Sequence, residues 1–261
     1  MYRVLSMRLY GALAAAVIGL GAAAEAATLE ITSFGSGQAS AARTALQAFQ
    51  SGGDGWGGAG MTVTAKTESF EGYAAWNGVS GASNPGATAV GSFTSLGGVG
   101  HGGSSINGGT SLQVRNDASW PWGRQNVSGV SNNWLDSNDT YGMSWSASGV
   151  EGFNALAFLL TDVADVGAKF SIRVGDQLFQ DLVGASERTA NGSIHLVRIL
   201  LPSAVNGINI QLINNRLNDG FGIDGATIAK VAPVPVPPAA ALVVSGVALL
   251  FGLGRRRSRA A

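Results

Sequence analysis

The chain has 261 residues with no cysteine, two histidines, and 16 basic against 16 acidic residues. The lack of cysteine excludes disulfides, thiolate metal sites and a cysteine nucleophile. Glycine is abundant, at 39 residues, and only 12% of residues are charged, which is typical of an all-β domain with many turns.

The first 26 residues carry the three parts of a secretory signal peptide in order. Arg3 and Arg8 form a basic n-region, residues 9–20 form an apolar h-region, and the tripeptide AEA at 24–26 matches a cleavage site. We therefore expect an exported chain. Without this segment and the arginines after residue 254, 10 basic and 15 acidic residues remain, a net charge of −5. This charge argues against nucleic acid as a partner, since phosphate binding needs a basic face.

Residues 27–58 are predicted to form a strand, a helix and a linker ahead of the main domain. Residues 28–34, TLEITSF, alternate between apolar and polar, as a strand does. In the next segment the apolar residues recur at helical spacing: Ala42, Leu46 and Phe49. Ser40 is the expected N-cap of this amphipathic helix, and Gly52 follows its end.

Residues 59–231 carry about nine β-type segments separated by turn clusters rich in Gly, Asn and Asp. The segments are MTVTAKTESFEGY, ATAVGSFTSL, TSLQVRN, YGMSWSA, NALAFLLTDV, AKFSIRVGDQLFQDLV, IHLVRILLP, NGINIQLINN and FGIDGATIAKV. No repeat of 20–50 residues is visible, which argues against a solenoid or propeller. We predict an all-β fold, an antiparallel β-sandwich of jelly-roll type.

The first and last of these segments resemble a known pair. ESFEGY, which contains Glu71, and FGIDGATI, which contains Asp224, resemble the bracketing strands of jelly rolls in carbohydrate-binding modules and MAM-like domains. The resemblance implies a structural calcium ion shared by Glu71 and Asp224, to which Asp219 and Asn218 could add oxygens. Facing carboxylates on neighbouring strands favour a cation between them. The alternative is a surface glutamate and a turn aspartate without an ion.

A second acidic cluster, NNWLDSNDT, contains Asp136, Asn138 and Asp139. Its spaced oxygen side chains superficially resemble a calcium loop, and we count Asp136 and Asp139 among the candidate calcium ligands. The EF-hand pattern is absent, since no Gly stands at the sixth position and no Glu at the twelfth. Asn and Asp are also good turn residues, so a plain turn is the alternative.

The segment SWPWGRQN at 119–126 is the candidate ligand-binding loop. Pro121 stiffens the chain between Trp120 and Trp122, whose rings could stack on sugars while Arg124 hydrogen-bonds hydroxyl groups. An extracellular polysaccharide is the corresponding partner. The alternative is that the tryptophans fill the core, which is the favoured reading for Trp145 in its alternating strand.

No catalytic pattern marks the chain as an enzyme. It has neither a G-x-S-x-G elbow nor a histidine zinc motif. His101 lies in a glycine-rich loop, and His195 lies in a strand pattern, where a single histidine is more often structural. A glycan-active hydrolase would need two carboxylates facing one cleft, and no motif marks such a pair. We expect a protein without enzymatic activity.

The chain ends with a proline-rich spacer at 232–238, an apolar segment at 239–254 and a basic tail at 255–261. As a helix the 16 uncharged residues would be about 24 Å long, shorter than the ~30 Å hydrocarbon core of a bilayer. The segment would therefore span only with bilayer thinning or help from the spacer, with the basic tail on the cytoplasmic side.

VPVPPAAALVVSGVALLFGLGRRR resembles the C-terminal sorting signal of the PEP-CTERM class in its VPLPA-CTERM variant. The motif and the basic cluster fall on Val234, Pro235, Val236, Pro237, Ala239, Arg255, Arg256 and Arg257. Val236 stands for Leu, and Pro238 is inserted. The resemblance implies cleavage by an exosortase, a membrane transpeptidase-like protease, after transient anchoring in the inner membrane. The alternative is a plain C-terminal membrane anchor.

These features lead to competing hypotheses. The first is an exported surface or extracellular-matrix protein with a calcium-stabilised β-sandwich and a structural or adhesive role. The second is a glycan binder similar to a carbohydrate-binding module. A glycan-active hydrolase is the third, and no motif supports it.

Overall fold

The computed structural model describes most of the predicted sandwich but neither end of the chain. The described residues are 26–53, 62–76, 83–98, 110–116, 123–129, 133–163, 167–180, 182, 191–217 and 219–232. Residues 1–25 of the predicted signal peptide, Trp120, Trp122, Asn218 and all predictions about residues 233–261 therefore lie outside the described residues. Within those residues, no helix has the length and apolar character needed to cross a membrane.

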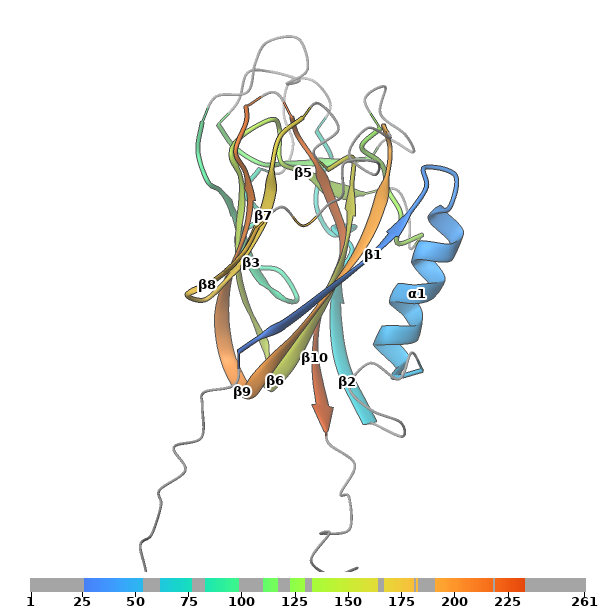
Figure 1. The fold of residues 1–261 in the computed structure, drawn as a ribbon, viewed down its shortest axis with the longest axis vertical. Coiled ribbons are helices and arrows are strands. Elements are labelled where there is room, and N and C mark those ends of the chain that lie inside the picture. Colours follow the sequence, from blue (N-terminus) through green and yellow to red (C-terminus); the bar gives the residue numbers. More distant parts are fainter. Residues whose placement is uncertain are drawn as a thin grey trace, which may run out of the picture.

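The described part contains ten strands and one helix, which confirms the all-β prediction (Figure 1). In chain order they are β1 (Thr28–Phe34), α1 (Ala39–Ser51), β2 (Thr62–Glu68), β3 (Gly91–Ser95), β4 (Gln113–Arg115), β5 (Trp134–Asp136), β6 (Gly142–Thr161), β7 (Phe170–Val174), β8 (Gln177–Phe179), β9 (Ile194–Asn214) and β10 (Gly222–Ala232). All strand pairs are antiparallel.

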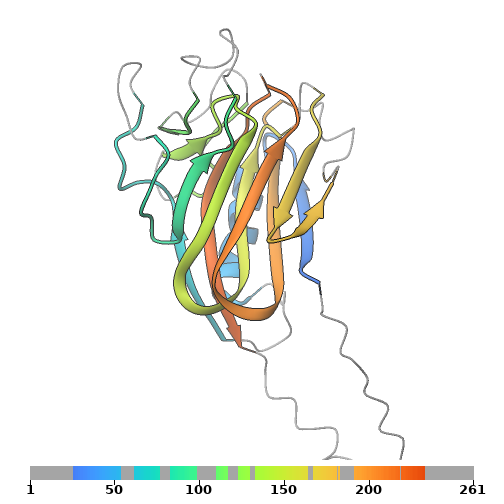
Figure 2. The same ribbon diagram turned by 90° about the vertical axis from the view of Figure 1, so that its left-hand side faces the viewer.

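The two long strands, β6 and β9, pair with each other and bend together, so each contributes to both layers (Figure 2). In one layer they lie between β1 and β10, and β10 also pairs with β2 and β5. In the other layer they lie between β3 and the β7–β8 hairpin. The pairing of β2 with β10 confirms that the first and last strands of the predicted 59–231 region are neighbours.

Apolar side chains from both layers meet in one continuous core. Trp145 lies fully buried there, stacked on Phe93 with ring centroids 5.4 Å apart and edge-on to Phe158 at 5.9 Å. Its indole N–H donates to the carbonyl of Val90 at 2.9 Å. Trp145 therefore has the core position that its alternating strand predicted.

The N-terminal strand and helix are part of the sandwich rather than an extension of it. β1 pairs with β9 along its whole length. The predicted apolar face of α1 packs on the outer surface of the β9–β6–β10 layer, through Ala42, Leu46 and Phe49. Gly52 ends the helix in the left-handed conformation, as predicted, but the N-cap is Gln38, without a side-chain cap, and not Ser40.

Strand register defines two ends of the sandwich. One cross-strand row joins Phe34, Ile194, Thr161 and Gly222, and we call this side the loop end. An opposite row joins Thr28, Leu200, Ala155 and Ala229, and we call that side the terminal end. β1 begins and β10 finishes at the terminal end, as Figure 1 shows.

Candidate functional site

The predicted acidic turn lies at the loop end. Asp136 lies in β5, a short strand that the sequence did not indicate, and is paired with Gly222 of β10. Asn138 and Asp139 follow in left-handed conformations, with φ of 53° and 56°. Asn and Asp tolerate this region better than other non-glycine residues. The turn that the composition allowed is therefore present, and its side chains point into the protein.

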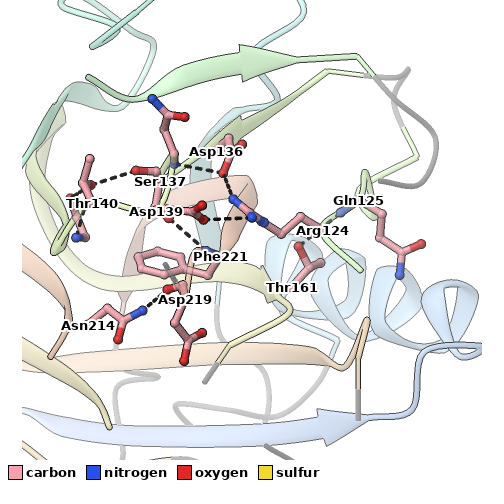
Figure 3. A network of polar contacts seen from close by, with 12 residues as sticks. Arg124, Gln125, Asp136, Ser137, Asp139, Thr140, Thr161, Asn214, Asp219 and Phe221 are labelled. Carbon is pink, nitrogen blue, oxygen red and sulfur yellow. Dashed lines mark hydrogen bonds and ion pairs between the residues drawn. The ribbon is translucent and has the colours of Figure 1, made fainter. Parts of the chain in front are cut away.

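The side chain that meets these carboxylates is Arg124 (Figure 3). Its Nη1 donates to Asp136 Oδ1 at 2.8 Å, and its Nη2 lies 2.9 Å from Asp139 Oδ1. We call these three residues the ion-pair cluster. All three are at most 2% exposed, so Arg124 has no free face for the hydroxyl groups of a sugar and the prediction of direct sugar contact is wrong for this residue.

The two carboxylates of the cluster are stabilised by contact with a guanidinium rather than by solvent. Burial by itself would lower the pKa of Arg124, but the carboxylates of Asp136, Asp139 and Asp162 outweigh burial and raise that pKa above its ordinary value. Asp136 Oδ1 also accepts from the backbone N–H of Asn138 at 3.0 Å. Asp139 makes no other polar contact within the described residues. The guanidinium is therefore what compensates the buried charge of Asp139.

Gly220, just before β10, packs against the ion-pair cluster. A Cβ atom on Gly220 would lie 2.3 Å from Arg124 Nη1 and 2.4 Å from Asp139 Oδ1. The next residue, Phe221, exchanges hydrogen bonds with Ser137 through its N–H and C=O, both at 2.9 Å. The backbone before β10 thus packs directly against the ion pairs and leaves no room for a larger side chain.

Asp219 does not join the cluster, although the sequence grouped it with the candidate calcium ligands. Its Oδ2 accepts from the backbone N–H of Ala168 at 2.9 Å, and its carbonyl accepts from the side-chain amide of Asn214. Figure 3 shows its carboxylate pointing away from Asp136 and Asp139. Asp219 therefore holds the start of the β7 region to the segment before β10.

Asp224 holds the other side of the Arg124 segment. Its Oδ2 accepts from the backbone N–H groups of Val127 and Ser128 at 2.9 and 2.7 Å, and its Oδ1 accepts from that of Gly225 at 2.7 Å. Burial raises the pKa of Asp224 to about 6, although these hydrogen bonds lower it. Arg124 and Asp224 together tie residues 123–129 to β5 and β10.

Glu71 lies in the turn after β2 and not in the strand itself. Its Oε1 accepts from the backbone N–H of Asn133 at 3.0 Å. The carboxylate that closes the strand is Glu68, which accepts from the N–H groups of Phe70 at 2.7 Å and Ala89 at 3.1 Å. Sequence reasoning missed Glu68. The feature that could have identified Glu68 is its position at the end of the alternating segment, where the chain must turn.

The candidate calcium ligands do not fit a shared calcium ion. Among the described residues, no group of three or more His, Cys, Asp or Glu side chains is placed to hold a metal. Glu71 and Asp224 accept from different backbone segments, and Asp136 and Asp139 contact a guanidinium. The hydrogen of a backbone N–H carries a partial positive charge, and a guanidinium carries a full one. Both therefore oppose a cation at the same oxygens.

His195 is fully buried between two serines. Its Nδ1 lies 2.9 Å from Ser33 Oγ, and its Nε2 lies 3.1 Å from Ser193 Oγ. The residue links the end of β1 to β9 at the loop end, away from solvent. This is the structural position that its strand pattern indicated.

Comparison with known proteins gives two distant structural matches. No protein family and no curated protein matches the chain. It is similar to the K2 cleaved adhesin domain of Lys-gingipain, with 11% identity, a TM-score of 0.36, and coverage of 63% of this chain and 97% of that one. It is also similar to the CBM22-1–GH10 modules of Clostridium thermocellum endo-1,4-β-D-xylanase 10B complexed with xylohexaose, with 13% identity, a TM-score of 0.26, and coverage of 41% of this chain.

The chain spans 23% of the xylanase chain. TM-scores of 0.36 and 0.26 are too low for either match to support an argument about this protein. The candidate site therefore stands on the chain's own geometry: a loop end at which residues 123–129, directly after the predicted sugar-binding tryptophans, are held by buried polar contacts.

Proposed function

We propose that this chain is an exported, non-enzymatic β-sandwich protein of the cell surface or extracellular matrix, with a structural or adhesive role. The observation that carries the proposal is the common position of the domain's two ends. β1 begins and β10 finishes at the terminal end, opposite the loop end. A domain held through the residues after Ala232 presents its loop end outward.

The sequence supplies the rest of the proposal. The signal peptide exports the chain, and the PEP-CTERM-like tail holds it in the inner membrane until an exosortase removes the tail. The mature body then passes to the cell envelope or matrix. The net charge of −5 on the body and the lack of a catalytic motif in the sequence suit this role.

The test is to express the full-length chain in a Gram-negative host that carries an exosortase. We expect the mature protein to begin at residue 27, to lack residues 255–261 by mass spectrometry, and to be digested by protease added to whole cells. The triple variant Arg255→Ala, Arg256→Ala, Arg257→Ala should keep its tail, whereas Arg173→Ala in the sandwich should be processed normally. A protein that retains residues 1–26 inside the cell would overturn the proposal.

Glycan binding at the loop end is the second candidate function. It is favoured by the anchoring of residues 123–129, because Arg124 and Asp224 hold the chain immediately after Trp122. A fixed stem lowers the entropy lost when an adjoining loop binds a ligand. In this candidate function the indole rings contact the ligand, and Arg124 is a positioning residue that holds the segment following them in the sequence.

A glycan array with the full-length chain tests this candidate. We expect binding to be lost in Trp120→Ala and Trp122→Ala and retained in Leu178→Ala, which removes an exposed apolar side chain of β8. Absence of binding to any glycan, or equal binding by all three variants, would count against the candidate and leave the structural role in place.

A further inference from the structure

We infer that the guanidinium of Arg124 is the cation that serves the acidic turn, and that the loop end is held together without calcium. The bracketing segments imply a calcium ion, but the structure gives each candidate carboxylate a partner from the chain itself. Arg124 meets the two carboxylates of the acidic turn. The inference concerns this assembly and is independent of the proposed surface role.

The first argument is geometric. A guanidinium is a planar fork that can contact two carboxylates at once, with a charge that does not titrate in proteins. Here its two terminal nitrogens reach Asp136 and Asp139 at 2.8 and 2.9 Å. One side chain thus joins three segments: the stretch at 123–129, the β5 turn, and the backbone at Gly220 that packs on it.

The second argument is charge balance in a buried place. Asp136 and Asp139 are 1% and 0% exposed, and their ion-pair partner is Arg124, which is 2% exposed. Two buried carboxylates without a cation would be strongly unfavourable. A calcium ion beside Arg124 would meet a positive group at ordinary contact distance from the same oxygens. Among the described residues, the guanidinium is the cation that contacts both carboxylates.

The third argument comes from Glu71 and Asp224, the other pair expected to bind calcium. Asp224 accepts three backbone N–H bonds of 2.7 to 2.9 Å. Glu71 accepts from the N–H of Asn133 at 3.0 Å. N–H donors at these distances point their hydrogens at the oxygens that a cation would need. Glu71 and Asp224 therefore accept hydrogen bonds from backbone amides, whereas the resemblance implied that they bind a calcium ion.

The consequence is that the order of residues 123–129 does not depend on the calcium concentration outside the cell. Ligand binding at the loop end should share this independence. Arg124 is in this sense a positioning residue: it acts on the loop end by holding backbone segments and not by touching a ligand.

Thermal unfolding of the full-length chain in mild detergent, with and without calcium, tests the inference. We expect the same melting temperature in millimolar calcium and in EGTA, because a metal that does not bind the folded state cannot stabilise it. A saturable rise in melting temperature with calcium, abolished in the double variant Asp136→Asn, Asp139→Asn or in Asp224→Asn, would overturn the inference.

Variants test the role of the guanidinium. Arg124→Ala should lower the melting temperature on the order of 10 °C with or without calcium, since it leaves two buried carboxylates uncompensated. The matched control Arg173→Ala removes a partly exposed arginine of β7 and should melt close to the wild type. Arg124→Lys, which keeps the charge but lacks the fork, should fold and melt between Arg124→Ala and the wild type.

The triple variant Arg124→Ala, Asp136→Asn, Asp139→Asn separates charge from packing. We expect it to melt above Arg124→Ala, because the neutral amides no longer need a cation. If the triple variant melts as low as Arg124→Ala, or if Arg124→Ala melts with the wild type, the guanidinium does not have the role inferred here.

Discussion

Asp224 combines burial with dense hydrogen bonding, and the two act in opposite directions on its charge. Burial raises its pKa to about 6, while the backbone N–H groups of Ser128, Val127 and Gly225 lower it. The ordinary value is 3.8, so between about pH 4 and 6 the folded chain holds this proton and the unfolded chain releases it. The contribution of Asp224 to stability is full below about pH 4 and is lost as the pH rises through 6.

We therefore predict that the wild type loses up to about 3 kcal/mol of unfolding free energy relative to Asp224→Asn between pH 4 and 7. The variant should be the less stable protein at acid pH, because its amide N–H₂ faces backbone donors. Urea unfolding across this range measures both. Asp176→Asn, on the exposed turn before β8, is the control. Parallel pH profiles for the wild type and Asp224→Asn would refute the prediction.

Gly220 is required for space rather than for backbone conformation. Because an added Cβ would lie 2.3 Å from Arg124 Nη1, Gly220→Ala should push the guanidinium from its carboxylates and cost about 3 kcal/mol of stability. Gly86→Ala is the matched control, since a Cβ there meets nothing within 4 Å. Denaturant midpoints for both variants check this, and equal midpoints would contradict the packing argument.

At the scale of residues, the sequence identified the right side chains but not their partners. The sequence predicted Arg124 as a sugar-binding residue and Asp136 and Asp139 as calcium ligands, whereas in the structure these three residues contact one another. Their mutual contact depends on how residues 123–129 cross the end of β5. No periodicity encodes that crossing, because the segment has no regular secondary structure.

Helix α1 illustrates an element whose face the sequence does predict. Ala42, Leu46 and Phe49 recur at helical spacing and are all buried against the outer surface of the β9–β6–β10 layer. Leu46 packs closely on Gly225, where an added Cβ would lie 2.5 Å from Leu46 Cδ2. The helix thus covers a sheet face that would otherwise expose apolar side chains.

We predict that Leu46→Ala lowers the unfolding free energy by about 2–4 kcal/mol, through lost burial and the cavity left on the sheet. Gln47→Ala, one residue further along on the exposed side of the helix, should change it by less than about 0.5 kcal/mol. Chemical denaturation measures both. A similar change in both variants would mean that burial of Leu46 on the sheet does not stabilise the domain.

The long strands show why element boundaries were harder to predict. Gly149 and Gly152 divide one apolar stretch, and Pro202 and Gly207 interrupt another. The sequence therefore indicated four strands where the structure has two, β6 and β9. Gly149 and Gly152 have positive φ, at 115° and 63°, and the register with β9 shifts there. These residues bend a continuous strand from one layer into the other, as bulges do at sheet corners.

At the scale of the molecule, the two-layer sandwich followed from alternating patterns, because half-buried antiparallel strands require them. The placement of the start of β1 and the end of β10 on one side did not follow from the sequence. It arises because β1 and β10 run in opposite directions relative to the bends of β6 and β9, with Thr28 and Ala229 on one cross-strand row. This arrangement gives the domain a polarity that a surface protein can use.

The polarity predicts how the uncleaved chain stands on a membrane. The chain has no cysteine, so a single introduced thiol can carry a donor fluorophore. Ser36 lies exposed after β1 at the loop end, and Ser203 lies exposed in the bend of β9 at the terminal end. The seven residues of β1 put the two ends about 20–25 Å apart.

With full-length protein in vesicles that contain a lipid-linked acceptor, energy transfer should be clearly stronger from Ser203→Cys than from Ser36→Cys. The tail after Ala232 would hold the terminal end close to the bilayer, and the four prolines between 233 and 238 would keep the spacer extended and the loop end outward. Removal of residues 233–261 should abolish transfer from both labels. Equal transfer from the two labels would mean that the domain has no fixed orientation, and stronger transfer from Ser36→Cys would place the loop end on the membrane and refute outward presentation.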